Sequence, residues 1–305
     1  MAKFKGLIAA PFTPMDSKGN VTYEKIPAYY EFLEKNKVAG AFINGSTGEG
    51  VSLTQKERMR ITEEWTKTSG IRKSVKVINL VGGTSYTECI ENAIHSAEQG
   101  IDAVAVLAPY YFKPSGSGQL ADFCARIAET VPEIPFYFYH IPVLTGCYVP
   151  MLDFLKEASN SIPNLAGIKY THEDFMDFLS CIHFMDGKYE MLWGRDENLL
   201  SALVLGTRSG VGSTYNYAAP LYYRMIDAFD KNNLPEARRL QQLSINMITL
   251  LGKYGGISTG KAYMRYIGFD CGKFRLPVKN MSDEKYSKFA DEARSLGLEE
   301  MFSVR

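Results

Sequence analysis

The sequence has few of the features that mark metal-binding or redox proteins. It contains five cysteines in 305 residues, widely scattered and without a Cys-x-x-Cys pair. This pattern argues against a zinc knuckle and a dithiol redox site, and it favours reduced, partly buried thiols. The four histidines also lack the spacing of a metal site. We therefore expect no bound metal.

Long apolar runs and an excess of one charge are absent as well. No stretch approaches the ~20 apolar residues of a membrane-spanning helix, and Pro11 interrupts a run near the start that is too short for a signal-peptide core. Lys plus Arg and Asp plus Glu both total 34, so no net charge favours nucleic acid or an anionic membrane. The sequence predicts a cytoplasmic protein without nucleic-acid or membrane partners. Zero net charge does little to oppose self-association.

What the chain does contain is a repeated alternation of short apolar runs with helical patterns. Near-continuous apolar strands, each followed by a helix, are typical of a parallel sheet closed into a (β/α)8 TIM barrel. An open, doubly wound sheet is the alternative, but no Gly-x-Gly-x-x-Gly follows the first strand. The eight expected strands are Gly6–Ala10, Ala41–Asn44, Val75–Val81, Ala103–Leu107, Phe136–Tyr139, Leu165–Tyr170, Glu190–Trp193 and Ser209–Gly212.

Helix boundaries are also indicated by the sequence. Thr54-x-x-Glu57 and Ser85-x-x-Glu88 have the form of capping boxes, and Gly100 is a suitable stop for the helix expected before it. After the eighth strand and its helix, helical patterns continue at residues 234–253, 260–267 and 283–296. We expect residues 1–230 to form the barrel and residues 231–305 to form a helical extension packed on it as part of one structural unit.

Polar residues collect at the ends of the expected strands. Ser46 and Thr47 follow the second strand, Tyr139 ends the fifth, and Lys169 lies near the end of the sixth. Residues 194–197 and 213–214 follow the seventh and eighth. Because active sites of these barrels lie at the carboxyl ends of the strands, we predict that these residues meet at one rim.

Lys169 is the most informative of them, because it stands in an apolar run. A buried ammonium without partners is costly and tends to lose its proton, and a neutral amine is what Schiff-base chemistry requires. The alternative is a lysine that extends to the surface from the strand end. Neighbouring strands lie about 4.8 Å apart, so the Tyr139 hydroxyl could stand beside the amine and transfer protons.

Each of the other residues also has a purely structural interpretation. The segment 45–50 is either an ordinary turn or an anion cradle built from two hydroxyls and backbone N–H groups. Asp196 and Glu197 could simply be acids at a helix start. We expect His140 to be a packing residue or a residue that supports the site from behind, not a ligand, and the pair Tyr110–Tyr111 could pack at the rim. Their convergence at one rim favours a site.

Four motifs together resemble the N-acetylneuraminate lyase and dihydrodipicolinate synthase superfamily, over essentially the whole chain. They are Gly45–Glu49 (GSTGE), Tyr139–Pro142 (YHIP), Gly167–Lys169 (GIK) and Gly212–Asn216 (GSTYN). The resemblance implies a class I aldolase that forms a Schiff base with pyruvate or a related 2-oxo acid, needs no cofactor and is a homotetramer.

By the same resemblance, particular residues take particular roles. Lys169 would form the Schiff base, Tyr139 would be the proton shuttle, and Ser46 and Thr47 would hold the substrate carboxylate. Tyr111 matches a tyrosine that reaches towards the site of a neighbouring subunit.

Three departures from the synthase pattern favour the lyase branch. The chain has Leu144 where synthases usually carry arginine, Ser46 where they commonly have threonine, and Tyr170 where they have glutamate. A polyhydroxylated sugar needs hydrogen-bond acceptors, which two adjacent carboxylates supply. The residues that match a sugar site are Thr171, Gly194, Asp196, Glu197 and Ser213, while the role of Arg195 stays open.

The implied reaction is the reversible cleavage of N-acetylneuraminate to pyruvate and N-acetylmannosamine. The alternatives are an aldolase of the same superfamily that acts on another 2-oxo acid, such as a deoxy-sugar acid aldolase or a dihydrodipicolinate synthase, and a non-catalytic relative that binds 2-oxo acids.

Overall fold

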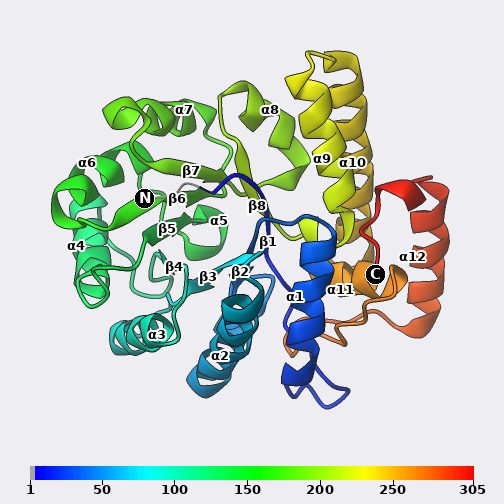
Figure 1. Cartoon of the computed structure of the whole chain (residues 1–305), viewed down its shortest axis with the longest axis horizontal. Helices are drawn as coiled ribbons and strands as arrows, with labels where there is room; N and C mark the ends of the chain where they lie inside the picture. The colour runs from blue at the N-terminus through cyan, green and yellow to red at the C-terminus, as the bar shows by residue number, and fades with distance from the viewer. Residues whose placement is uncertain (1–3) are drawn as a thin grey trace.

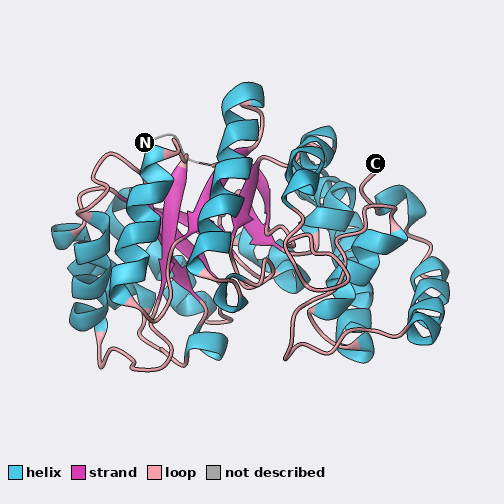
Figure 2. Ribbon diagram, turned by 90° about the horizontal axis from the view of Figure 1, so that it is seen from below, coloured by secondary structure: helices cyan, strands magenta, loops and turns pink. Residues whose placement is uncertain are grey.

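The computed structural model describes residues 4–305, and eight parallel strands close into a barrel at its centre (Figures 1 and 2). They follow one another around the barrel in sequence order, and β1 closes the ring against β8. The (β/α)8 prediction is confirmed, with every strand end within one residue of its expected position. The strands are β1 Gly6–Ala9, β2 Gly40–Ile43, β3 Lys76–Leu80, β4 Ala103–Leu107, β5 Phe136–His140, β6 Leu165–Tyr170, β7 Glu190–Trp193 and β8 Ser209–Gly212.

The barrel has one apolar core inside its ring of strands and another between the strands and the surrounding helices. Successive side chains of a strand point to opposite faces. In β5, Tyr137 and Tyr139 therefore belong to the inner core, whereas Phe136 and Phe138 belong to the outer one. Burial on both faces is the reason that these strands appear as continuous apolar runs in the sequence.

Helices surround the strands and cover the barrel (Figure 1). Thr54 and Glu57 form the expected capping box at the start of α2. Ser85 accepts a hydrogen bond from the Glu88 N–H group and thus caps α3, and Gly100, with φ of +73°, follows the end of that helix. The helices up to residue 230 are α1 Ile26–Lys35, α2 Gln55–Arg72, α3 Tyr86–Glu98, α4 Ser117–Ala128, α5 Pro142–Thr145, α6 Met151–Ser161, α7 Phe175–His183, α8 Leu199–Val204 and α9 Tyr215–Asp230.

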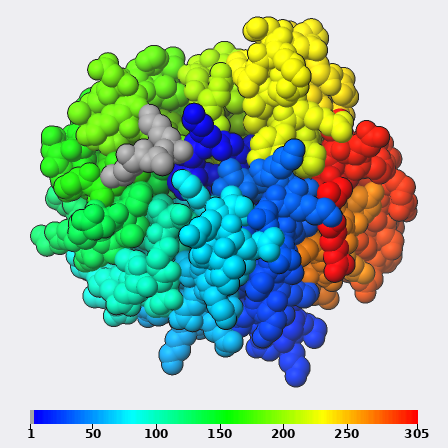
Figure 3. All heavy atoms as spheres, in the orientation of Figure 1, coloured from blue at the N-terminus to red at the C-terminus, as the bar shows by residue number. Residues whose placement is uncertain are grey.

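Three further α-helices follow, as the sequence predicts: α10 Leu234–Tyr254, α11 Ser258–Tyr266 and α12 Asp283–Ser295. We call residues 231–305 the extension. It lies beside α9 and α1, so the last residues of the chain contact the first helix (Figures 1 and 3). The Val304 N–H group donates to Asn36 Oδ1 at 2.8 Å, and the Ser303 N–H group donates to the Tyr217 carbonyl at 2.7 Å.

Candidate active site

The strand register places Lys169 beside Tyr139. The two residues are Cα partners across the pairing of β5 with β6. The Lys169 Nζ atom lies 3.9 Å from the centroid of the Tyr139 ring and 4.1 Å from that of Phe42 on β2. The expected neighbours are therefore together, although the amine lies over the face of the phenol ring. Phe42 was not predicted, because nothing distinguishes it from other apolar strand residues.

The environment of Lys169 favours the neutral amine. The residue is only 4% exposed, so the alternative of a lysine that extends to the surface is wrong. Burial lowers the pKa of its amine to about 7, and the Asp196 carboxylate opposes part of this shift. An ordinary lysine titrates near 10.4 and is almost fully protonated at neutral pH. Because burial brings the pKa of Lys169 close to 7, a large share of this amine is deprotonated at neutral pH.

Tyr139 remains a neutral phenol in the same surroundings. Burial raises the pKa of its hydroxyl to about 12, and the nearby hydroxyls of Ser46 and Thr171 oppose part of this shift. The polar ends of three strands therefore meet at Tyr139, since Ser46 follows β2, Tyr139 lies on β5 and Thr171 follows β6. The predicted convergence at one rim holds for these residues.

The loop after β2 that carries Ser46 and Thr47 is a tight turn. The Glu49 N–H group donates to the Ser46 carbonyl at 3.1 Å, and the Gly50 N–H group donates to the Gly45 carbonyl at the same distance. From the loop after β1, Thr13 Oγ1 donates to the Gly48 carbonyl at 2.5 Å. Thr47 is buried and Ser46 half-buried, so their hydroxyls are held in a fixed, partly dehydrated loop.

Asp196, after β7, is a buried carboxylate with one oxygen in use. Its Oδ2 atom accepts hydrogen bonds from the Thr214 N–H group at 3.0 Å and from Thr214 Oγ1 at 2.6 Å. Its Oδ1 atom is buried and makes no hydrogen bond of ordinary length within residues 4–305. Burial raises the pKa of this carboxyl group to about 6. A buried carboxylate oxygen that makes no hydrogen bond of ordinary length is suited to accept one from a ligand hydroxyl.

Two glycines make room for these polar groups. A Cβ atom on Gly212 would stand 1.8 Å from Asp196 Oδ1, and one on Gly194 would stand 1.9 Å from Thr171 Oγ1. The Thr171 hydroxyl is also buried without a hydrogen bond of ordinary length in the described chain. Ser213 is half-buried directly after β8. Thr171, Gly194, Asp196 and Ser213 thus lie at the carboxyl ends of three consecutive strands.

Glu197 is ion-paired, and its partner is Arg195. The Nη2 atom of Arg195 lies 2.7 Å from Glu197 Oε1 and 2.6 Å from Glu173 Oε1, on the loop after β6. Arg195, whose role the sequence left open, therefore links the loops after β6 and β7. Glu173 was missed, because no sequence signal pairs it with Arg195.

Tyr111 does not join the other residues within this chain. Its side chain is 78% exposed and packs edge-to-face on Phe112, with ring centroids 5.1 Å apart. His140 is buried with its ring centroid 5.0 Å from that of Tyr170, and burial lowers the pKa of its imidazole to about 3, which agrees with a residue that packs behind the site. All five cysteines are free and buried.

Features of other protein classes are few in the described part of the chain. Among residues 4–305, no three His, Cys, Asp or Glu side chains are grouped so that they could hold a metal ion. No helix in the same range is long and apolar enough to cross a membrane.

Comparison with known proteins identifies the family. Residues 3–296 match the Dihydrodipicolinate synthetase family. The chain belongs to this family. Within it, the human protein named N-acetylneuraminate lyase is 39% identical over 299 residues, which cover 96% of this chain and 91% of the human one.

Solved structures of family members agree with the fold. The N-acetylneuraminate lyase of Proteus mirabilis superposes with a TM-score of 0.93 at 34% identity, covering 97% of this chain and 99% of the other. The N-acetylneuraminate lyase (sialic acid aldolase) of Aliivibrio salmonicida superposes with a TM-score of 0.94 at 35% identity, covering 97% and 98%. The sequence-based resemblance is therefore confirmed.

Proposed function

We propose that this member of the family is a Schiff-base aldolase that reversibly cleaves N-acetylneuraminate to pyruvate and N-acetylmannosamine. The observation that carries the proposal is the position of the buried Lys169 amine against the Tyr139 ring, where burial lowers its pKa to about 7. The substrate is inferred from the relatives named N-acetylneuraminate lyase and from the acceptors after β7.

The 2-oxo acid end of the substrate would bind at the β2 loop and Lys169. Ser46 and Thr47 hydroxyls donate hydrogen bonds to its carboxylate. The neutral Lys169 amine attacks the ketone of the open-chain sugar, and loss of water leaves an iminium cation. This cation accepts the electron pair of the bond between carbons 3 and 4 when that bond breaks.

Tyr139 would act in the proton transfer that accompanies this cleavage. Because its phenol is neutral, Tyr139 relays the proton of the 4-hydroxyl to the substrate carboxylate, donating its own proton as it accepts that one, while N-acetylmannosamine leaves as an aldehyde. The same proton returns to carbon 3 of the remaining enamine, and water hydrolyses the iminium to release pyruvate and regenerate the Lys169 amine. The iminium is itself the electron sink, so these steps require no metal, nucleotide or other cofactor.

The sugar end would be held by the groups after β6, β7 and β8. Asp196 Oδ1 and Thr171 Oγ1 are two of the buried polar atoms that make no hydrogen bond of ordinary length within residues 4–305, and sugar hydroxyls would be their partners. Glu197, the Gly194 carbonyl and Ser213 complete this subsite. The Arg195 ion pair fixes the orientation of Glu197.

We further propose that the enzyme is a cytoplasmic homotetramer in which Tyr111 contributes to a neighbouring subunit's site. The exposure of the adjacent Tyr111 and Phe112 supports an interface at this rim, because exposed aromatic clusters mark interaction surfaces. Five free cysteines support a reducing compartment.

The decisive experiment is a coupled assay of pyruvate release from N-acetylneuraminate. Parallel assays with a 2-keto-3-deoxy sugar acid, and of condensation with an amino-acid semialdehyde, test the rival aldolases. Leu144, at the position of the synthase arginine, is exposed and uncharged, which disfavours the semialdehyde. Absence of turnover in all three assays, together with measurable binding of pyruvate, would instead support a non-catalytic 2-oxo acid binder.

The rate of imine formation with pyruvate should rise as the pH increases through about 7 and then level off. Burial lowers the pKa of Lys169 to about 7, so raising the pH through this value converts the ammonium to the reactive amine. Trapping with cyanoborohydride, followed by mass spectrometry, measures the rate. Asp196→Asn should move the midpoint to lower pH, because its carboxylate raises the pKa of Lys169. A midpoint near 10 would contradict the assignment.

Asp196→Ala should raise the KM for N-acetylneuraminate on the order of 10- to 100-fold, the value of a hydrogen bond to a charged group. The pyruvate concentration for half-maximal trapping should stay within about twofold, since pyruvate has no sugar hydroxyls. Steady-state kinetics and trapping on the same preparation measure both quantities. Equal losses for both ligands would contradict a role at the sugar end.

A further inference from the structure

The loop that carries Ser46 and Thr47 is attached to the extension through Glu49. This glutamate is only 4% exposed, and both of its carboxylate oxygens are in use. Its Oε1 atom accepts a hydrogen bond from Lys261 Nζ on α11 at 2.9 Å, and its Oε2 atom accepts one from the Arg275 N–H group at 2.8 Å. Two segments that are more than 200 residues away in sequence therefore hold a residue of the β2 loop.

Lys261 is itself buried among groups that fix its position. Its side chain is 2% exposed, and Nζ also donates to the Lys273 carbonyl at 2.9 Å and lies 4.7 Å from the centroid of the Phe274 ring. A buried ion pair contributes little net stability, whereas removing one partner is costly, because the other charge is left buried. Such a pair is better explained by the geometry that it imposes than by stability.

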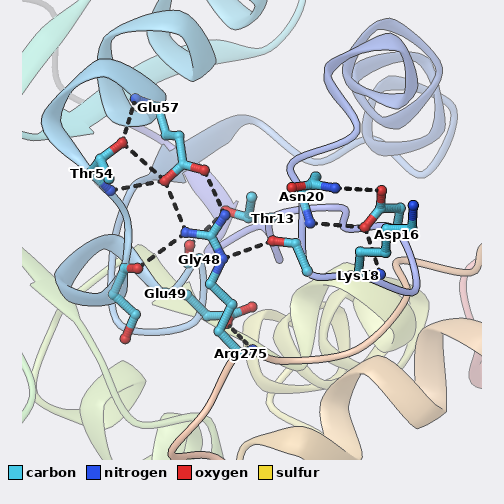
Figure 4. A network of polar contacts seen from close by, with 11 residues as sticks. Thr13, Asp16, Lys18, Asn20, Gly48, Glu49, Thr54, Glu57 and Arg275 are labelled. Atoms are coloured by element: carbon cyan, nitrogen blue, oxygen red, sulfur yellow. Dashed lines mark hydrogen bonds and ion pairs between the residues drawn. The ribbon is translucent and has the colours of Figure 1, made fainter.

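Arg275 of the extension also contacts the segment that follows the β2 loop, at the start of α2. The Arg275 guanidinium group contacts Glu57 Oε1 at 2.5 Å and the Gly19 carbonyl at 2.8 Å. Glu57 in turn forms the capping box with Thr54 at the start of α2. Figure 4 shows Arg275 between Glu57 and Glu49. The stretch from Ser46 to Glu57 is therefore held between the barrel and the extension.

The backbone conformation of Glu49 explains why the loop depends on the contacts from Lys261 and Arg275. Its φ of +61° lies in the left-handed region, which a glutamate seldom adopts without surrounding contacts. Glu49 donates its N–H group to the Ser46 carbonyl, so a change of its backbone would move Ser46 directly. Small displacements of groups that orient a substrate have large effects on binding and reaction.

We propose that Lys261 is a positioning residue for substrate binding, and that through Glu49 the extension sets the conformation of the loop that holds the 2-oxo acid carboxylate. The inference rests on the proposed binding of that carboxylate by Ser46 and Thr47. The carboxylate is bound throughout the reaction, so a displaced loop weakens substrate and transition state alike. Loss of the Lys261 side chain therefore raises KM and leaves kcat nearly unchanged.

Two variants separate positioning from stability. Lys261→Met leaves the Glu49 charge buried without its cation, so the protein should unfold at a lower temperature. In the double variant Glu49→Gln/Lys261→Met both charges are gone, the glutamine oxygen can still accept from Arg275, and most of the stability should return. We expect the pyruvate concentration for half-maximal borohydride trapping to rise about tenfold in both variants, as the loss of one charge-assisted hydrogen bond implies.

The controls distinguish the possible failures. Lys253→Met removes an exposed ion pair with Glu292 in the same extension and should leave trapping unchanged. If the double variant recovers both stability and native pyruvate affinity, the pair only supports the fold and the inference is wrong. Failure of the unmodified enzyme to be trapped by pyruvate would instead overturn the proposed function. A fall in kcat with KM unchanged would also refute the positioning role.

Discussion

Replacing Lys169 with methionine should reduce pyruvate release from N-acetylneuraminate by at least about 10⁴-fold, as expected when a covalent nucleophile is removed. Methionine is similar in length and is uncharged, so it suits a site that is 4% exposed and bordered by Phe42 and Tyr139. The variant should fold and be at least as stable as the parent, because a buried amine is replaced by an apolar group. Steady-state kinetics and thermal unfolding measure the two effects.

Trapping gives this prediction a direct chemical test. The parent enzyme treated with pyruvate and borohydride should gain one reduced adduct, located at Lys169 by peptide mass spectrometry, and Lys169→Met should gain none. Lys156→Met is the matched control, since Lys156 is exposed on α6 and pairs with Asp153 at 2.8 Å. An adduct at another lysine, or substantial turnover by Lys169→Met, would refute the Schiff-base assignment.

Tyr139→Phe should lower kcat for cleavage about 10²- to 10³-fold, within the range for loss of a general acid–base group. The ring that lies 3.9 Å from Lys169 Nζ is retained, so the pKa of the amine and its capture of pyruvate should change much less. The experiment compares kcat for N-acetylneuraminate with the extent of pyruvate trapping. Equal decreases in kcat and in the extent of trapping would mean that the Tyr139 hydroxyl is needed for the reactivity of the Lys169 amine and not for the proton transfer.

Tyr137→Phe is the appropriate control for this variant. Tyr137 lies two residues earlier on β5, faces the same inner core and donates its hydroxyl proton to Glu190 Oε2 at 2.7 Å. Removing that hydroxyl leaves a buried acceptor with one fewer donor, so stability should fall. Turnover per folded molecule should remain near that of the parent.

Much of the architecture could be predicted because it follows from local patterns. Both faces of each strand are buried, so the strands appear as apolar runs, and their ends could be placed within one residue. The Thr54–Glu57 capping box and the stop at Gly100 are local hydrogen-bond and backbone effects. The carboxyl ends of parallel strands share one rim, so the gathering of Ser46, Tyr139 and Lys169 followed from the order of the strands.

Other features depend on which side chains meet after folding. The amine of Lys169 lies over aromatic faces because β2 and β5 bring Phe42 and Tyr139 to the same depth inside the barrel. The pairing of Glu173 with Arg195 depends on how two rim loops approach each other. No periodicity or motif encodes such contacts, so the sequence could name Arg195 without giving it a partner.

The amino-acid order alone was enough to specify an eight-stranded barrel and to place a lysine and a tyrosine on adjacent strands at its mouth. Hydrophobic periodicity, helix caps and the order of the strands depend on residues that are close in sequence, so they can be recognised from the sequence alone. Tertiary packing determined that Lys169 is buried, that Asp196 Oδ1 makes no hydrogen bond of ordinary length within residues 4–305, and that Glu49 forms an ion pair with Lys261. These properties arise from exclusion of water and from contacts between distant segments, which exist only once the barrel has closed and the extension has packed against it.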